Sequence, residues 1–297
     1  MIPGIHALVD LQKAAVQHVD LPINADVLRI DKIHAIISGN KWFKLQYALE
    51  DAIRLHKKSL LTFGGAYSNH LLATAYSCAK LGIPSIGIIR GEEPAIRSFT
   101  LEECHQLGMQ LHYVSRDEYR TDTSRIAEQF PDAYIIEEGG RSTLGVKGAA
   151  DIAGLTDISR YTHICCAVGT GTMMAGLINS INEKQHVSGI CSLKLPAADN
   201  SIDQFIQQST RGKKNYSIRY DYHFGGYAKK TPALLAFMND FYTRTNIPLD
   251  FVYTAKMMYG IMDLATKNHF PPGSRLLIIH SGGLQGNRSL PKNTLVF

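Results

Sequence analysis

The sequence predicts an α/β protein with a parallel β-sheet covered by helices. Short apolar runs rich in β-branched residues alternate with amphipathic segments of helical period along almost the whole chain, which is typical of repeated βα units. Three of the apolar runs end in glycine-bearing turns. In open α/β sheets such turns bind ligands, because they meet at the carboxyl edge of the strands.

The expected elements follow from this alternation. We expect strands at 60–64, 84–90, 110–114, 133–137, 163–168, 187–193 and 276–280, and helices at 69–81, 99–107, 123–130, 172–182 and 232–242. The stretch 139–155 is rich in glycine and small residues and separates two βα blocks. It is expected to mark a domain boundary with a ligand cleft beside it.

The composition excludes several classes of protein. With 45% apolar and 19% charged residues, the 297-residue chain is typical of a globular protein and not of a disordered one. The net charge of +5 is spread over short basic doublets, so we expect no nucleic-acid partner. No apolar run reaches the ~20 residues that span a bilayer, and no signal peptide is visible. We therefore expect no membrane association. Since the five cysteines form no zinc or redox motif, we also expect no metal and a cytoplasmic protein.

A lysine occupies the first turn of another expected helix. In the stretch SGNKWFKLQYAL, residues 38–49, a Gly-Asn pair precedes a long amphipathic run, and Lys41 stands at the positive end of the helix dipole. Taken alone, Lys41 is explained most simply as a solvated surface residue.

The turn after the strand at 60–64 can hold an anion or cap a helix. Its sequence, GGAYSNH, allows a tight turn at two glycines and places Ser68 and Asn69 at the start of the next helix. The two side chains and the backbone N–H groups there suit an anionic substrate group, although capping alone explains them equally well.

The turn after the strand at 163–168 suits a phosphate. Residues 169–172, GTGT, supply exposed N–H groups and two hydroxyls at a helix N-terminus. Met174 replaces the third glycine of a dinucleotide fingerprint, and no Gly-Lys-Ser/Thr of a P-loop follows. A single phosphate monoester therefore fits best. The turn at 280–283, HSGG, is expected to form another ligand wall, with His280 as a core histidine.

A lysine near a glycine turn, combined with a phosphate cradle, indicates pyridoxal phosphate chemistry. The chain resembles pyridoxal-phosphate enzymes of the tryptophan synthase β-like fold (fold type II), in the branch of 1-aminocyclopropane-1-carboxylate deaminase and D-cysteine desulfhydrase. The blocks GNKWFKL, GGAYSNH, GTGT and VYTAKMMYGIMDL carry this resemblance, which runs from about residue 28 to the end. It implies two open, twisted, mostly parallel sheets flanked by helices, with the cofactor in a cleft between two domains. The large domain would comprise 1–47 and 151–297, and the smaller inserted domain 48–150.

The resemblance also implies roles for individual residues. Lys41 would bond covalently to the cofactor, pyridoxal 5'-phosphate, and shuttle protons. Ser68, Asn69 and His70 would face the substrate, His70 beside its carboxylate, and Asn69 would also meet the ring hydroxyl of the cofactor. Tyr227 and Tyr253 would line the active site with Lys41 and Ser68 as catalytic residues. The phosphate would lie on Gly169, Thr170, Gly171 and Thr172, and the ring nitrogen would face Thr254.

The implied activity is that of a lyase or deaminase acting on a small amino acid. Since Thr254 is neutral where the deaminase branch carries glutamate, α,β-elimination from D-cysteine or a similar β-substituted amino acid is favoured. Three alternatives stay open at this point: 1-aminocyclopropane-1-carboxylate deamination, a racemase or dehydratase, and a non-catalytic protein that binds a phosphate ligand. The resemblance also implies a homodimer.

Overall fold

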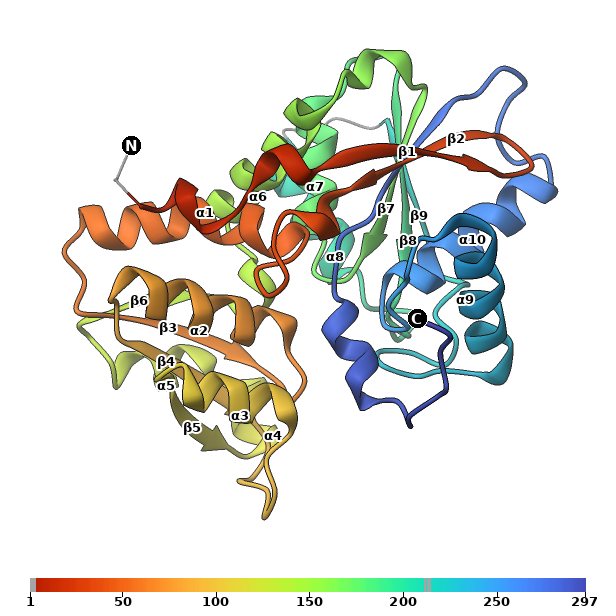
Figure 1. Ribbon diagram of the computed structural model, residues 1–297. Helices are drawn as coiled ribbons and strands as arrows, with labels where there is room; N and C mark the ends of the chain where they lie inside the picture. The colour runs from red at the N-terminus through yellow and green to blue at the C-terminus, as the bar shows by residue number, and fades with distance from the viewer. Residues whose placement is uncertain (1–3, 211, 213–214) are drawn as a thin grey trace.

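Two β-sheets, each flanked by helices, make up the computed structural model, which describes residues 4–210, 212 and 215–297 (Figure 1). The larger sheet has the strand order β1-β2-β10-β7-β8-β9, and the smaller sheet has the order β5-β4-β3-β6. All pairings are parallel except that of β1 with β2. The predicted fold class, two mostly parallel sheets flanked by helices, is confirmed.

The strands are β1 (Ala15–Asp20), β2 (Asn24–Arg29), β3 (Ser59–Gly64), β4 (Ser85–Arg90), β5 (Gln110–Val114), β6 (Ala133–Ile136), β7 (His163–Val168), β8 (His186–Cys191), β9 (Tyr216–Arg219) and β10 (Leu276–Ile279). The α-helices are α1 (Asn40–Arg54), α2 (Asn69–Leu81), α3 (Phe99–Gln106), α4 (Arg116–Thr121), α5 (Thr123–Glu128), α6 (Thr143–Ala150), α7 (Thr172–Ser180), α8 (Ser201–Ser209), α9 (Pro232–Thr245) and α10 (Thr254–Thr266). Strands between Ser59 and Ile136 form the smaller sheet, and strands before and after them form the larger one.

Serine residues fix the starts of several helices. The side chains of Ser68, Ser98, Ser115 and Ser142 each accept a hydrogen bond from the backbone N–H three residues later, at the first turns of α2, α3, α4 and α6. Such a cap satisfies one of the N–H groups that a helix start leaves without an intrahelical partner.

Three strands of the larger sheet were not predicted. Strands β1 and β2 form an antiparallel hairpin at one edge, and β9 forms the opposite edge. Most β1 side chains are exposed or half-buried, and β9 has only four residues, all half-buried. The edge strands β1 and β9 bury few side chains, so their sequences lack the apolar run by which the central strands are recognised. Strand β2 is mostly buried, but Asn24, Asp26 and Arg29 interrupt its apolar run.

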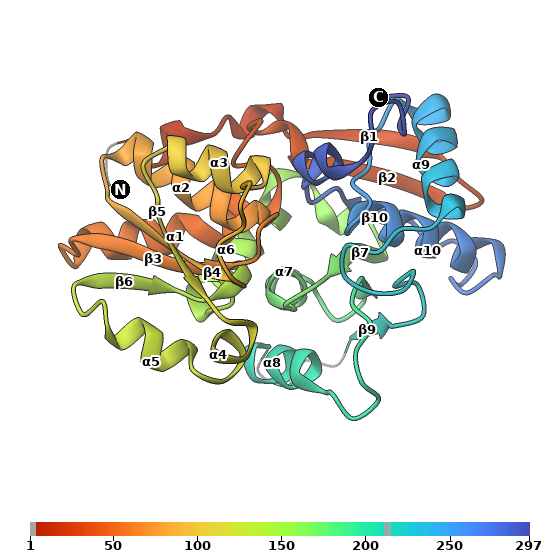
Figure 2. The same ribbon diagram turned by 90° about the horizontal axis from the view of Figure 1, so that it is seen from below.

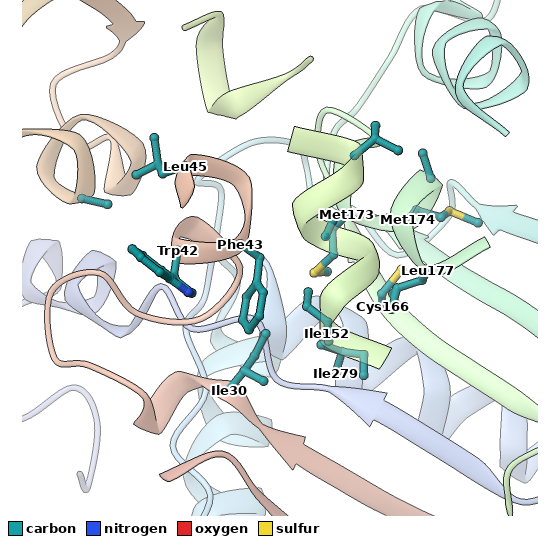
Figure 3. Packing of buried hydrophobic residues seen from close by; sticks show 14 of the residues in the cluster. Ile30, Trp42, Phe43, Leu45, Ile152, Cys166, Met173, Met174, Leu177 and Ile279 are labelled. Carbon is teal, nitrogen blue, oxygen red and sulfur yellow. The ribbon is translucent and has the colours of Figure 1, made fainter. Parts of the chain in front are cut away.

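The small-residue stretch at 139–155, expected to mark a domain boundary, contains helix α6, which packs between α1 and α7. A Cβ at Gly148 would lie 1.7 Å from the Phe43 carbonyl oxygen of α1, and a Cβ at Gly176 of α7 would lie 2.6 Å from the Ala149 Cβ. The small residues therefore allow three helices to approach closely. Figure 3 shows the adjoining core, with Phe43 of α1 and Met173 of α7 beside Ile152.

We expect Gly148→Ala to lower the free energy of unfolding by about 1–3 kcal/mol, because α1 and α6 must move apart to admit the new methyl group. Gly154→Ala is the matched control, since nothing lies within 4 Å of a Cβ at that position. Urea denaturation followed by circular dichroism measures both. Equal stability of the two variants would contradict the close packing of α1 on α6.

Candidate active site

A cavity of ≈ 1290 Å³ lies between the two sheets and is lined by residues from both. The three predicted glycine turns border it together: Gly65, Ser68, Asn69 and His70 after β3, Gly169, Thr170 and Gly171 after β7, and Ser281, Gly282 and Gly283 after β10. Lys41, Tyr227 and Tyr253 also line it. Thr172 and Thr254 are fully buried and lie behind this lining.

Helix α1 begins in direct backbone contact with the turn after β10. Gly39 has a φ of +63°, and a Cβ there would lie 1.9 Å from the Ser281 carbonyl oxygen. The Asn40 N–H donates to the same carbonyl over 3.1 Å. Only glycine allows both the left-handed backbone and the close approach, so the Gly-Asn-Lys sequence fixes the next residue, Lys41, at the cavity.

The amine of Lys41 is held away from bulk water. Its Nζ donates to Asn40 Oδ1 over 2.7 Å and lies 6.0 Å from the Tyr253 ring centroid. Burial lowers the pKa of Lys41 to about 8, although the nearby Asp250 carboxylate acts in the opposite direction. A solvated surface lysine would show no such environment, so the structure favours a chemical role for this amine.

A second lysine, Lys44, lies beside the first and was not predicted. It is 6% exposed, and its Nζ donates to the Gly139 carbonyl over 3.2 Å. Burial, with the charge of Lys41, lowers the pKa of Lys44 to about 7. The signal was available in the sequence, because positions 41 and 44 share one face of a helix.

His70 is buried as a neutral imidazole. Its Nε2 lies 3.0 Å from Thr62 Oγ1, and that hydroxyl already donates its proton to the Ile136 carbonyl. Nε2 is therefore the donor, and Nδ1 is a bare acceptor with no hydrogen-bond partner among the described residues. Burial, reinforced by Lys41 and Lys44, lowers the pKa of His70 to about 3. In this state the ring cannot donate to a substrate carboxylate, whereas its backbone N–H, in the first turn of α2, can.

Asp250 stands behind Thr254. Its carboxylate accepts hydrogen bonds from the N–H groups of Val252, Tyr253 and Thr254 and, over 2.7 Å, from Thr254 Oγ1. This cap orients the start of α10, which carries Tyr253 into the cavity. The neutral Thr254 hydroxyl is therefore hydrogen-bonded to the Asp250 carboxylate behind it. The sequence alone did not indicate this arrangement.

The remaining predicted residues are placed as follows. Ser68 Oγ accepts from the Leu71 N–H over 3.2 Å and keeps its own proton available. The Tyr227 and Tyr253 rings meet with their centroids 6.0 Å apart. His280 is fully buried as a core residue, with Nε2 2.7 Å from the Pro248 carbonyl oxygen.

The chain matches the pyridoxal-phosphate dependent enzyme family over residues 29–282. It belongs to this family. It is 31% identical to a putative 1-aminocyclopropane-1-carboxylate deaminase of Pyrococcus horikoshii, over 89% of this chain and 86% of the relative. It is 25% identical to a D-cysteine desulfhydrase of Salmonella choleraesuis, over 86% of each. Among solved structures, an ACC deaminase homologue superposes with a TM-score of 0.80 at 29% identity and 97% coverage of both chains.

The residues at the cavity fit pyridoxal phosphate. Lys41 would supply the amine for covalent attachment. The Asn69 Oδ1 atom is buried with no partner among the described residues and can accept from a ring hydroxyl. A Cβ at Gly169 would lie 3.1 Å from the Tyr253 ring, so glycine allows the turn after β7 to pack against this ring. Gly169, Thr170 and Gly171 line the cavity directly before the N-terminus of α7, where backbone N–H groups would hold the phosphate. Lys44 adds positive charge near the expected phosphate position. Its Nζ contacts the Gly139 carbonyl, and Gly139 lies against Thr170 of the turn after β7.

We expect Lys44→Met to weaken cofactor binding by tenfold or more and to stabilise the apoprotein by roughly 1–3 kcal/mol at pH 7. The folded pKa of Lys44 lies below the ordinary value of 10.5, so between about pH 10.5 and 7 the unfolded chain binds more protons. The free energy of unfolding of the wild type therefore falls as the pH falls through this range. In Lys44→Met this contribution to the pH dependence should be absent.

Absorbance titration of the apoprotein with pyridoxal phosphate, and urea denaturation at pH 7 and 10, measure these effects. Lys32→Met, at an exposed position, is the control and should match wild type. Unchanged cofactor affinity in Lys44→Met would show that this lysine does not contact the phosphate.

Proposed function

We propose that this enzyme catalyses α,β-elimination from D-cysteine or a similar β-substituted amino acid, giving a keto acid, ammonia and the leaving group. The observation that carries the proposal is the Lys41 amine, desolvated at the cavity with a pKa lowered to about 8. A general base works best with a pKa near the operating pH. The D-cysteine desulfhydrases among its relatives support the choice of substrate.

Some groups at the cavity bind the substrate, and others transfer protons. Bound pyridoxal phosphate supplies an electron sink for negative charge at the substrate α-carbon. Lys41 Nζ, or Ser68 Oγ, takes the α-proton. The backbone N–H groups of Asn69 and His70, which have no intrahelical acceptor, hold the substrate carboxylate. Where Lys41 is the base, the Ser68 hydroxyl donates to the same carboxylate. Burial raises the pKa of Tyr253, so its hydroxyl stays protonated as a donor beside Lys41.

Deamination of 1-aminocyclopropane-1-carboxylate is the second candidate. The putative deaminase of Pyrococcus horikoshii supports it, as does the Asp250 carboxylate hydrogen-bonded to Thr254. A carboxylate favours a protonated ring nitrogen and a stronger electron sink. The neutral Thr254 hydroxyl alone therefore does not decide between the two reactions.

The remaining proposals concern organisation. We propose a large domain of 1–47 plus 151–297 and an inserted domain of 48–150, supported by the division of strands between the two sheets. The resemblance to the family supports a homodimer. The five free, buried cysteines support a location in the cytoplasm. Among the described residues, no helix has the length and apolar character needed to cross a membrane.

The decisive experiment compares substrates and tests the lysine together. We expect wild type to carry a visible absorbance band that borohydride removes, with the label on Lys41, and to release pyruvate and sulfide from D-cysteine. Lys41→Ala should lose the label and at least 1,000-fold of activity, whereas Lys147→Ala, at an exposed position, should keep both.

Release of 2-oxobutyrate from 1-aminocyclopropane-1-carboxylate, with D-cysteine inert, would favour the deaminase. A protein that stays colourless with added pyridoxal phosphate would overturn the proposal and favour a non-catalytic phosphate-binding role.

A further inference from the structure

Arg90 extends from the carboxyl end of β4 into the cavity, on the wall formed by the smaller sheet. Its Nη2 lies 3.3 Å from the position of a Cβ at Gly65, so the guanidinium lies against the turn that leads to Ser68. Its side chain is 42% exposed, and its ion pair with Glu138 has a single long contact of 3.8 Å. Most of its N–H donors are therefore free to meet a ligand.

Tyr119 lies under this arginine. The Arg90 Cζ is 5.4 Å from the Tyr119 ring centroid, a cation–π arrangement that holds the guanidinium plane in place. Tyr119 is 6% exposed and lines the same cavity, and its hydroxyl makes no hydrogen bond of normal geometry among the described residues. The Glu138 carboxylate acts together with burial to raise the pKa of Tyr119, so a ligand anion at Arg90 would compete with Glu138 for the proton of this hydroxyl.

Two tyrosine rings lie between the Lys41 amine and the charged groups of this wall. Lys41 Nζ lies 6.0 Å from the Tyr253 ring, which lies 6.0 Å from the Tyr227 ring. Glu138 raises and Arg90 lowers the pKa of Tyr227, after the larger effect of burial, so both charges are near neighbours of that ring. Arg90 therefore faces the catalytic tyrosines from the opposite wall.

The cavity has room for a substrate that reaches Arg90. Its volume of ≈ 1290 Å³ exceeds the roughly 300–1,000 Å³ usual for small-molecule sites. The α-carboxylate already has its place at the Ser68 turn and the N-terminus of α2. An additional anion at Arg90 must therefore belong to another part of the substrate.

We propose that Arg90 and Tyr119 form a subsite for a carboxylate at the far end of the substrate's β-substituent. The inference rests on the proposed elimination and narrows its substrate class. The planar guanidinium presents paired N–H donors that match the two oxygens of a carboxylate, and the Tyr119 hydroxyl adds a third donor. Glu138 competes with the ligand for Arg90 and limits the affinity of the subsite.

The test uses two substrates that differ only in charge: S-carboxymethyl-cysteine and its neutral amide, S-carbamoylmethyl-cysteine, each as D and L enantiomers. In each reaction the α-proton is removed and the C–S bond breaks, with its electron pair leaving on sulfur. Water then converts the released enamine to pyruvate and ammonia. We expect wild type to prefer the acid over the amide by at least tenfold in kcat/KM.

The variants separate a specific subsite from general positive charge. Arg90→Gln should bring the acid-to-amide ratio close to one, Tyr119→Phe should lower it severalfold, and Glu138→Gln should raise it about threefold. Arg120→Gln is the control: Arg120 lines the same cavity from α4 and is 76% exposed, and its loss should leave the ratio within twofold.

The outcomes distinguish this inference from the proposed function. Wild type that turns over D-cysteine and β-chloroalanine but shows equal kcat/KM for acid and amide would overturn the subsite and leave the elimination intact. If no amino acid is turned over, dissociation constants of the acid and amide, measured on the holoenzyme by calorimetry, take the place of kcat/KM. Equal affinities, or a preference unaffected by Arg90→Gln, would then overturn the subsite.

Discussion

Direct backbone contact between the start of α1 and the turn after β10 places the reactive amine. Gly39 and Ser281 approach so closely that no side chain fits between them, and the helix therefore begins at one position with one direction. The two segments are about 240 residues apart in the sequence. The Lys41 site is thus complete only when the last strand of the larger sheet has joined the sheet between β2 and β7.

This placement has an electrostatic cost that the cavity does not balance with its own groups. Lys41 and Lys44 are both desolvated, with pKa values lowered to about 8 and about 7, and His70 beside them is neutral. Asn69 Oδ1 and His70 Nδ1 also lack partners among the described residues. Such unfavourable terms accumulate at functional sites, where a ligand offsets them. A dianionic phosphate and an amino-acid carboxylate would supply the missing charge.

Sequence patterns predicted the features that repeat or that need a special backbone. The central strands and their glycine turns were recognised because buried parallel strands are continuous apolar runs and the turns require glycine. Strand β1 was missed because an edge strand buries few side chains, and β2 was missed because its polar residues Asn24, Asp26 and Arg29 interrupt its apolar run. Lys44 was missed although the sequence places it on the same helix face as Lys41, three residues further on. Its desolvation and the Asp250 cap could not be predicted, because a lysine or an aspartate looks the same in the sequence whether it is solvated or desolvated, and only the tertiary structure sets its environment. The close packing of Gly148 on α1 was not predicted, because the small residues of a helix contact look the same in the sequence as the small residues of a domain boundary.

The two sheets contribute different kinds of group to the cavity, and this follows from their topology. The larger sheet and α1 supply Lys41, the turn after β7 and Tyr253, the groups that we propose act on the cofactor and the α-carbon. The smaller sheet supplies the Ser68 turn after β3 and Arg90 at the end of β4. Adjacent parallel strands lie about 4.8 Å apart, and the β3–β4 register pairs Gly64 with Ile89. The groups for the two ends of a substrate are therefore held at a fixed separation by the hydrogen bonds of one sheet. Selectivity for a β-substituent can change through Arg90 and its neighbours without moving the amine that performs the chemistry.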